Sequence, residues 1–182
     1  MLKKLILVVV ALAAVLALIG LVLPSRVVVT RTASIDAPRE DVFAIVNGFV
    51  RFNQWSPWFE LDPNATYVVE GPAAGVGAVL RWQGDPDAVG SGTLRIVESR
   101  APELVTMEVS IGPVSGRRIQ LALAEEGRGT RVTWSLDTEM GANPFARYAG
   151  LLFDWFIGRD FDKGLARLKA LAERPGEGAG SD

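Results

Sequence analysis

The chain has 182 residues, a formal net charge of −2, and neither histidine nor cysteine. Without imidazole and thiolate groups, disulfides, structural zinc, most transition-metal sites and His-based catalytic triads are excluded, so we expect no metal and no cofactor. The sequence pI is near 5.3 and no cluster of Lys and Arg alternates with aromatic residues, which argues against a nucleic-acid partner.

The first predicted element is a membrane-spanning helix. An uncharged apolar run extends from Leu5 to Leu23 and is preceded by Lys3 and Lys4. At about 1.5 Å per residue it is long enough to cross the hydrocarbon core of a bilayer. A cleaved signal peptide has a shorter apolar core and a small-x-small cleavage site, and Leu21-Val22-Leu23-Pro24 offers no such site. We favour an uncleaved, single-pass signal anchor over residues 1–25 in the cell membrane, with the N-terminus in the cytoplasm and the following domain outside.

The segment after the anchor is predicted to contain one strand and two short helices. Arg26–Ile35 is rich in β-branched residues, which favour a strand. Asp36-Ala37-Pro38 is typical of a helix start, with a cap residue followed by proline at the first helical position. We expect the first helix to end at Gly48 and a second to form over Phe49–Gln54.

The hydrophobic period then changes to two, which predicts a series of strands. Short turns that contain Gly, Pro or charged residues separate them, and such turns favour antiparallel hairpins over crossover helices. The six candidate strands are Tyr67–Glu70, Val76–Gln83, Thr93–Glu98, Leu104–Ile111, Arg117–Ala124 and Thr130–Asp137.

Alternation along these strands predicts one covered face and one open face. In Leu104–Ile111 the residues in phase with Val105 are apolar, whereas Thr106 and Glu108 belong to the open face. The same phase places further residues on the covered side: Val76, Ala78, Leu80, Trp82, Leu94, Ile96, Ile119, Leu121, Leu123, Val132, Trp134 and Leu136.

A long helix is predicted to cover this face of the sheet. Asn143 can cap it, Pro144 can begin it, and it is expected to run to about Glu173. Between Tyr148 and Ile157 apolar residues cover most of the circumference, so we expect neighbouring loops to bury this stretch, with pocket lining or lipid contact as alternatives. The apolar stripe predicted to face inward includes Phe145, Leu152, Phe153, Phe156, Ile157, Phe161, Leu165 and Leu168.

Residues 26–173 are therefore expected to form one domain, and residues 174–182, which lack large apolar side chains, a disordered tail. A series of motifs runs through this domain: Arg31, Ile35-Asp36-Ala37-Pro38, Val42-Phe43, Trp55-Ser56-Pro57-Trp58, Gly75-Val76-Gly77-Ala78 with Trp82, Gly90 with Gly92, Thr130-Arg131-Val132-Thr133-Trp134, and Phe161-x-x-Gly164-Leu165-x-x-Leu168. In order and spacing the series resembles the START/SRPBCC superfamily, and within it the bacterial polyketide cyclase/dehydrase-like branch.

The resemblance implies an α+β helix-grip fold, in which a curved antiparallel sheet of about seven strands wraps around the long C-terminal helix and encloses a deep hydrophobic cavity. Members of the superfamily carry lipids, sterols, polyketides or plant hormones, and some are cyclases. The fold therefore does not select one function.

The candidate cavity residues come from the covered face and the last helix. Trp82 and Trp134 are the strongest candidates, because an indole ring can line a cavity and also donate one hydrogen bond. Packing in the core without a ligand is an equal alternative for both. Trp55 and Trp58 are candidates for the cavity entrance, with local packing around the turn between them as the favoured alternative. Further cavity candidates are Leu80, Met107, Val109, Leu121, Phe153 and Phe156.

Arg31 is the candidate for a polar contact with a ligand. It lies in phase with Val29 and Ile35, so its guanidinium is expected either to meet a ligand carboxylate or phosphate or to pair with an acid of the protein. We favour the protein pair, because buried charges usually need a partner. No spacing forms a phosphate loop, a metal cluster or a nucleophile elbow, so the sequence assigns no catalytic residue.

These features together predict a membrane-tethered binding or carrier domain for a hydrophobic, lipid-like or polyketide-like small molecule. One alternative is a polyketide cyclase or dehydratase, which the lack of histidine and the shortage of inward polar residues weaken. The other is a non-catalytic interaction module of the cell envelope with a filled core. A pocket with convergent polar groups favours the enzyme, a dry apolar pocket the carrier, and a filled core the module.

Overall fold

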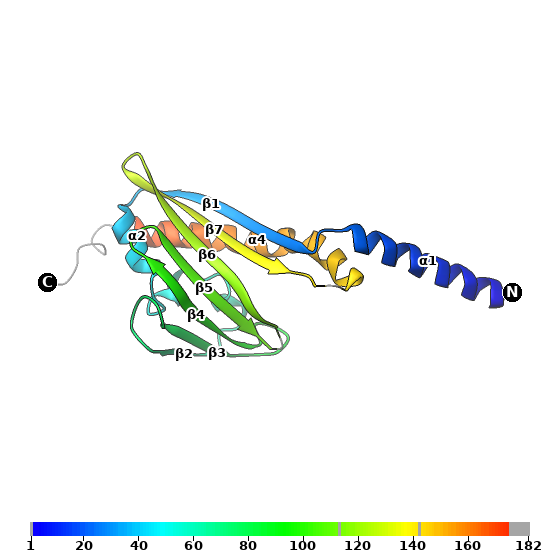
Figure 1. The fold of residues 1–182 in the computed structure, drawn as a ribbon. Helices are drawn as coiled ribbons and strands as arrows, with labels where there is room; N and C mark the ends of the chain where they lie inside the picture. Colours follow the sequence, from blue (N-terminus) through cyan, green and yellow to red (C-terminus); the bar gives the residue numbers. More distant parts are fainter. Residues whose placement is uncertain (1, 113, 142, 175–182) are drawn as a thin grey trace.

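The computed structural model describes residues 2–112, 114–141 and 143–174. A seven-stranded antiparallel sheet curves along the long C-terminal helix α4, and the apolar helix α1 projects away from this domain at one end (Figure 1). The predicted α+β helix-grip fold is confirmed.

The strands follow the spatial order β1-β7-β6-β5-β4-β3-β2, so the first strand pairs with the last. Irregularities of register between β4 and β5, at Ile96/Glu98, and between β5 and β6, at Val109/Ile111, help the sheet to bend. The bounds are β1 Arg26–Ile35, β2 Thr66–Glu70, β3 Val79–Gln83, β4 Ser91–Arg100, β5 Leu104–Ile111, β6 Val114–Glu126 and β7 Gly129–Glu139.

The helices also follow the predicted order. They are α1 Leu2–Val22, α2 Arg39–Val46, α3 Phe52–Trp55, the short 3₁₀ helix η1 Phe59–Leu61, and α4 Pro144–Ala172. The predicted start of α4 is confirmed, since the Asn143 side chain accepts a hydrogen bond of 2.9 Å from the Phe145 N–H. At α2 the prediction is one residue early: Pro38 has an extended backbone, with ψ of 145°, and precedes the helix.

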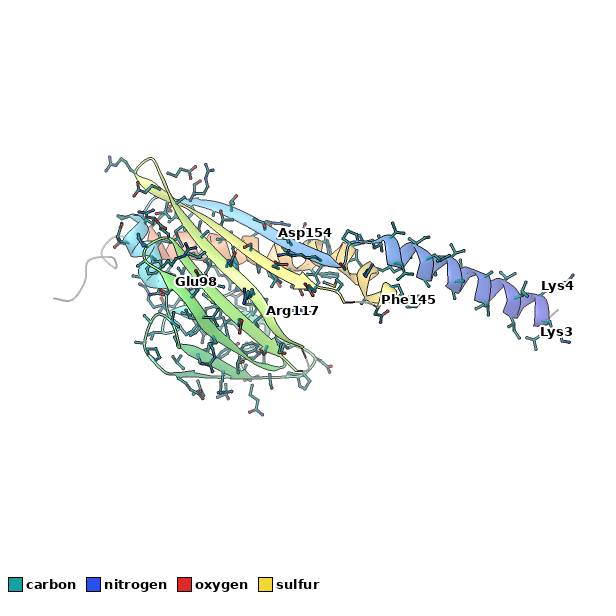
Figure 2. All side chains as sticks on the ribbon, viewed as in Figure 1. Lys3, Lys4, Glu98, Arg117, Phe145 and Asp154 are labelled. Carbon is teal, nitrogen blue, oxygen red and sulfur yellow. The ribbon has the colours of Figure 1, made fainter. Side chains whose placement is uncertain are left out.

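Helix α1 is long and apolar enough to cross a membrane, and nearly all of its large side chains are exposed. Its 21 residues extend about 32 Å. Lys3 and Lys4 lie at the end of α1 that is remote from the domain (Figure 2). A single apolar helix at this position is compatible with a membrane anchor or with a signal sequence.

The core lies between the concave face of the sheet and the C-terminal half of α4. Phe161, Leu165 and Leu168 are buried on this side of the helix. The Phe161 ring stacks on the Trp134 ring with 4.2 Å between their centroids. Gly164 lies one turn further along, where an added Cβ would be 2.5 Å from the Trp134 ring, so only glycine lets the helix approach β7 this closely.

Two residues, Val76 and Thr106, are not buried or exposed as the predicted faces of the sheet require. Val76 was expected on the covered face but is exposed, because β3 begins only at Val79. Thr106 was expected on the open face but is buried. Its neighbours across the two adjacent strands explain this, since the Thr106 hydroxyl contacts Glu98 at 3.0 Å and Gln120 at 3.4 Å.

The N-terminal half of α4 contradicts the predicted inward stripe. Phe145, Leu152 and Phe156 are exposed, and the expected burial of this stretch by loops is wrong for the described residues. The physical reason is visible in Figure 1, where α4 extends past the sheet toward α1. The predicted tail, apart from Arg174, lies outside the described residues.

Replacing Gly164 with Ala is expected to lower the free energy of unfolding by about 1–3 kcal/mol, because the added Cβ would overlap the Trp134 ring. Helix propensity alone predicts the opposite sign, a gain of up to about 1 kcal/mol. Denaturant unfolding of the full-length chain in detergent, followed by tryptophan fluorescence, measures the change. The exposed Lys163→Ala variant is the control and should stay within about 0.5 kcal/mol of the native chain. A stabilised Gly164→Ala variant would contradict the packing described here.

Candidate functional site

A cavity of about 370 Å³ lies between the sheet and the middle of α4. Its volume falls in the range of about 300–1,000 Å³ that is typical of small-molecule sites. The sheet contributes Tyr67, Leu80, Trp82, Leu94, Val109, Ile111, Arg117, Ile119 and Leu136, and α4 contributes Phe153, Ile157 and Phe161. The remaining walls are Phe52, Ser56, Trp58, Leu61, Pro86, Ala88, Val89 and Gly90.

The cavity lies toward the end of the sheet that adjoins α1. Strand β1 begins at this end, with Arg26 opposite Glu139 at the end of β7. The cavity residues Ile111 and Arg117 come from the end of β5 and the beginning of β6, which the antiparallel register brings to the same end. Ile111 is exposed, so the apolar lining reaches the protein surface here.

Five of the predicted site residues line the cavity. They are Trp58, Leu80, Trp82, Val109 and Phe153. The Trp82 indole N–H donates a hydrogen bond of 3.1 Å to the carbonyl oxygen of Val89, which fastens the loop between β3 and β4. The Trp82 ring lies over Gly92 on the neighbouring strand, where an added Cβ would overlap it.

Four other predicted residues lie deeper, in the packed core, and are not among the residues that line the cavity. Trp55, Met107, Leu121 and Trp134 are each at most 1% exposed. The Trp134 ring also meets the rings of Trp55 and Trp58 edge to face, with centroids 5.4 and 5.8 Å away. Aromatic packing fills the space that a ligand would otherwise take at this level of the sheet.

Phe156 and Arg31 lie outside the cavity. The Phe156 side chain is 57% exposed on the outer side of α4. Arg31 donates two hydrogen bonds to the carboxylate of Asp154, of 2.9 and 3.0 Å, and a longer one of 3.4 Å to Asp162. The hydrogen bonds from Arg31 hold the pKa of the Asp154 carboxyl below its usual range. The guanidinium therefore joins β1 to α4, and Figure 2 shows Asp154 at this side of the helix.

Arg117 is the one charged residue among the described residues that line the cavity. Its guanidinium carbon lies 5.6 Å from the centroid of the Phe153 ring, a cation–π contact. The described part of the chain places no carboxylate within 4.0 Å of this guanidinium. Alternation could have identified Arg117, because it lies in phase with Ile119 on the covered face.

Tyr67 adds a phenolic hydroxyl to the lining. Burial, with a contribution from the charge of Asp62, raises the pKa of its hydroxyl, so Tyr67 is neutral at neutral pH. Pairing could have identified Tyr67, because it lies in β2 directly opposite Trp82. No sequence signal pointed to the loop residues 86–90, because their placement depends on how the β3–β4 loop folds over the cavity.

Residues 26–173 match the family described as polyketide cyclase / dehydrase and lipid transport. The chain belongs to this family. No curated protein sequence matches the chain. Family membership and the apolar cavity together support a hydrophobic ligand-binding domain.

Solved structures share the fold of this family member at low sequence identity. Truncated norcoclaurine synthase from Thalictrum flavum is 12% identical, with a TM-score of 0.62 over 82% of this chain and 94% of that one. The di-domain ARO/CYC protein StfQ from the steffimycin biosynthetic pathway is 12% identical, with a TM-score of 0.60 over 81% of this chain and 51% of that one. The Aha1 dimer from Colwellia psychrerythraea is 17% identical, with a TM-score of 0.54 over 85% of this chain and 99% of that one.

The two best tryptophan candidates in this family member are expected to behave differently when each is replaced by Ala. Trp134→Ala should lower the free energy of unfolding by about 3–5 kcal/mol, because it leaves a void in the core. Trp82→Ala should cost less stability but weaken the binding of an apolar fluorescent probe about tenfold, since about 1.5 kcal/mol of contact is lost from the wall. Denaturant unfolding and probe titration of both variants separate the two roles. Equal probe binding by Trp82→Ala and the native chain would contradict a wall role for Trp82.

Proposed function

We propose that this protein is a membrane-tethered binding or carrier protein for a hydrophobic small molecule. The observation that carries the proposal is the cavity of about 370 Å³, whose walls are almost all apolar and which lies toward the end of the sheet that adjoins α1. In this proposal residues 1–25 anchor the chain in the cell membrane, and residues 26–173 form the binding domain on the extracytoplasmic side. A tether of this kind raises the local concentration of the domain beside lipid-soluble ligands.

Selectivity in such a cavity comes mainly from size and apolarity. Each methylene group that enters gains about 0.8 kcal/mol from leaving water. The Trp82 indole N–H is already bonded to the Val89 carbonyl oxygen, and the Ser56 hydroxyl accepts a hydrogen bond of 3.3 Å from the backbone N–H of Trp58. The described walls offer a ligand few polar groups besides Arg117 and the hydroxyls of Ser56 and Tyr67.

Arg117 adds a preference for one end of the ligand. A guanidinium without an acidic partner among the described residues can bind a carboxylate or a phosphate in a bidentate manner. The contact with the Phe153 ring holds Arg117 at the cavity wall before a ligand arrives. We therefore propose that the ligand is an amphiphile with an anionic head and an apolar chain.

Native mass spectrometry of the full-length chain purified in detergent, followed by organic extraction, tests the binding function. We expect about one co-purified amphiphile per chain. Val109→Trp should expel it, because the larger ring fills the cavity, whereas Val68→Trp on the exposed part of β2 should retain it. A clean apo mass that does not change after incubation with a lipid extract would contradict the proposal and favour a filled interaction module.

Arg117→Gln tests the anionic head group. We expect it to weaken the binding of a long-chain fatty acid about tenfold to hundredfold, because a charge-assisted hydrogen bond is lost, and to leave the fatty alcohol of equal length nearly unchanged. Isothermal titration of both probes measures the difference. The neighbouring Arg118→Gln is the matched control, since Arg118 is exposed and pairs with Glu108 at 3.8 Å. An equal loss for acid and alcohol would refute the assigned role.

A further inference from the structure

The edge strand of the sheet places a phenol on the cavity wall, well away from Arg117. Tyr67 lies in β2, directly opposite Trp82 of β3, and its ring lies beside the Phe59 ring with 5.5 Å between their centroids. The Tyr67 hydroxyl makes no hydrogen bond with any of the described residues. A hydroxyl on a cavity wall without a protein partner is available to a ligand, both as a donor and as an acceptor.

The charge of Asp62 determines which kind of group can meet this hydroxyl. Asp62 is almost completely buried, and its carboxylate accepts hydrogen bonds from the backbone N–H groups of Asn64, at 3.0 Å, and Asp85, at 2.7 Å. Burial, and with it the negative charge of Asp62, raises the pKa of the Tyr67 hydroxyl. The same charge repels an anion, so the ligand group that fits beside Tyr67 is a neutral oxygen, such as a hydroxyl or a carbonyl.

Tyr67 and Arg117 face the cavity from strands that are well separated. Four strand intervals lie between β2 and β6 in the sheet, which is about 19 Å along the curved surface at about 4.8 Å per interval. The direct path across the concave side is shorter. The strands between them contribute only apolar side chains and the hydrogen-bonded Trp82: Leu80, Trp82, Leu94, Val109 and Ile111. The sheet thus presents two polar groups with an apolar surface between them.

A ligand chain without a polar group would leave the Tyr67 hydroxyl unpaired. Water can satisfy a hydroxyl on an empty wall, but a saturated chain that displaces this water offers no hydrogen bond in its place, and affinity is lost. A chain that carries an oxygen at this position restores the bond. Sites that are built to hydrogen-bond a hydroxyl discriminate in this way against analogues that lack it.

We propose that the ligand is an oxygenated amphiphile, whose anionic head meets Arg117 and whose chain carries a hydroxyl or carbonyl oxygen that hydrogen-bonds to Tyr67. The inference rests on the binding function proposed above, and it adds the group that distinguishes this ligand from a plain fatty acid. Arg117 sets the direction in which the ligand lies, and Tyr67 sets the selectivity along its chain. The apolar wall between them holds the intervening methylene groups.

Hydroxy fatty acids test the inference. The probes are octadecanoic acid and its monohydroxy derivatives, with the hydroxyl placed at successive carbons along the chain. Their affinities for the full-length chain in detergent are measured by competition with an apolar fluorescent probe. We expect one narrow range of hydroxyl positions to bind at least as tightly as octadecanoic acid. A hydroxyl elsewhere should weaken binding, because it is buried against apolar wall without a partner.

Tyr67→Phe removes only the hydroxyl. We expect it to weaken the best-binding hydroxy acid about threefold to tenfold, through the loss of one neutral hydrogen bond, and not to weaken octadecanoic acid. Arg117→Gln should weaken both acids equally, since both carry the carboxylate. Tyr148→Phe is the matched control at the other tyrosine of the chain, whose hydroxyl bonds to Leu16 and lies outside the cavity lining. It should bind both acids as the native chain does.

Unfolding of the ligand-free variant separates a ligand contact from a role in the fold. Tyr67→Phe should unfold at the same denaturant concentration as the native chain, because its hydroxyl has no partner among the described residues. A lower midpoint, together with equal losses of affinity for the two acids, would show that the hydroxyl serves the fold and would overturn the inference.

The outcomes also separate this inference from the function on which it rests. If neither octadecanoic acid nor any derivative binds to the native chain, the binding function fails and the inference falls with it. If octadecanoic acid binds and depends on Arg117, but Tyr67→Phe weakens no hydroxy acid more than octadecanoic acid, the contact with Tyr67 is overturned and the proposed function stands.

Discussion

Every part of this structure depends on how helix α4 is seated in the curved sheet. Its C-terminal half packs tightly, because Gly164 lets the helix approach Trp134 and the Phe161 ring stacks on that indole. The ion pair of Arg31 with Asp154 then fixes the middle of the helix against β1. Toward the α1 end the cavity separates Phe153 and Ile157 of α4 from Leu80, Leu94 and Val109 of the sheet. Helix α4 is thus tightly packed at one end of the domain and borders the cavity at the other.

The position of α4 also places the cavity at the same end of the domain as the apolar N-terminal helix α1. The start of α4 leaves the sheet and meets α1 through Pro144, Arg147 and Tyr148. Three apolar features consequently lie at one end of the domain: the helix α1, the exposed side chains of the N-terminal half of α4 and the end of the cavity at Ile111. In the proposed function, this arrangement shortens the path over which an apolar ligand would be exposed to water between the membrane and the cavity.

The sequence was sufficient for the fold, because periodicity and turn residues are local signals that agree with the family motifs. The exact bounds of β1 and β5 and the cap at Asn143 followed from them. It was less informative about the cavity, since alternation tells which face a side chain takes and not how deep it lies. Trp82 and Trp134 share a face, yet only Trp82 reaches the open space. The exposed residues of α4 were missed because helical spacing does not reveal where the sheet ends.

Photo-cross-linking in vesicles tests the central claim, that a ligand taken from the bilayer occupies the space between the sheet and α4. A long-chain fatty acid with a terminal diazirine is incorporated in vesicles that contain the full-length chain, and the labelled residues are mapped by mass spectrometry. Our account predicts adducts on Leu80, Val109, Phe153 and Ile157, which surround the cavity. Adducts confined to α1 and the outer face of α4, with none on the cavity residues, would contradict it.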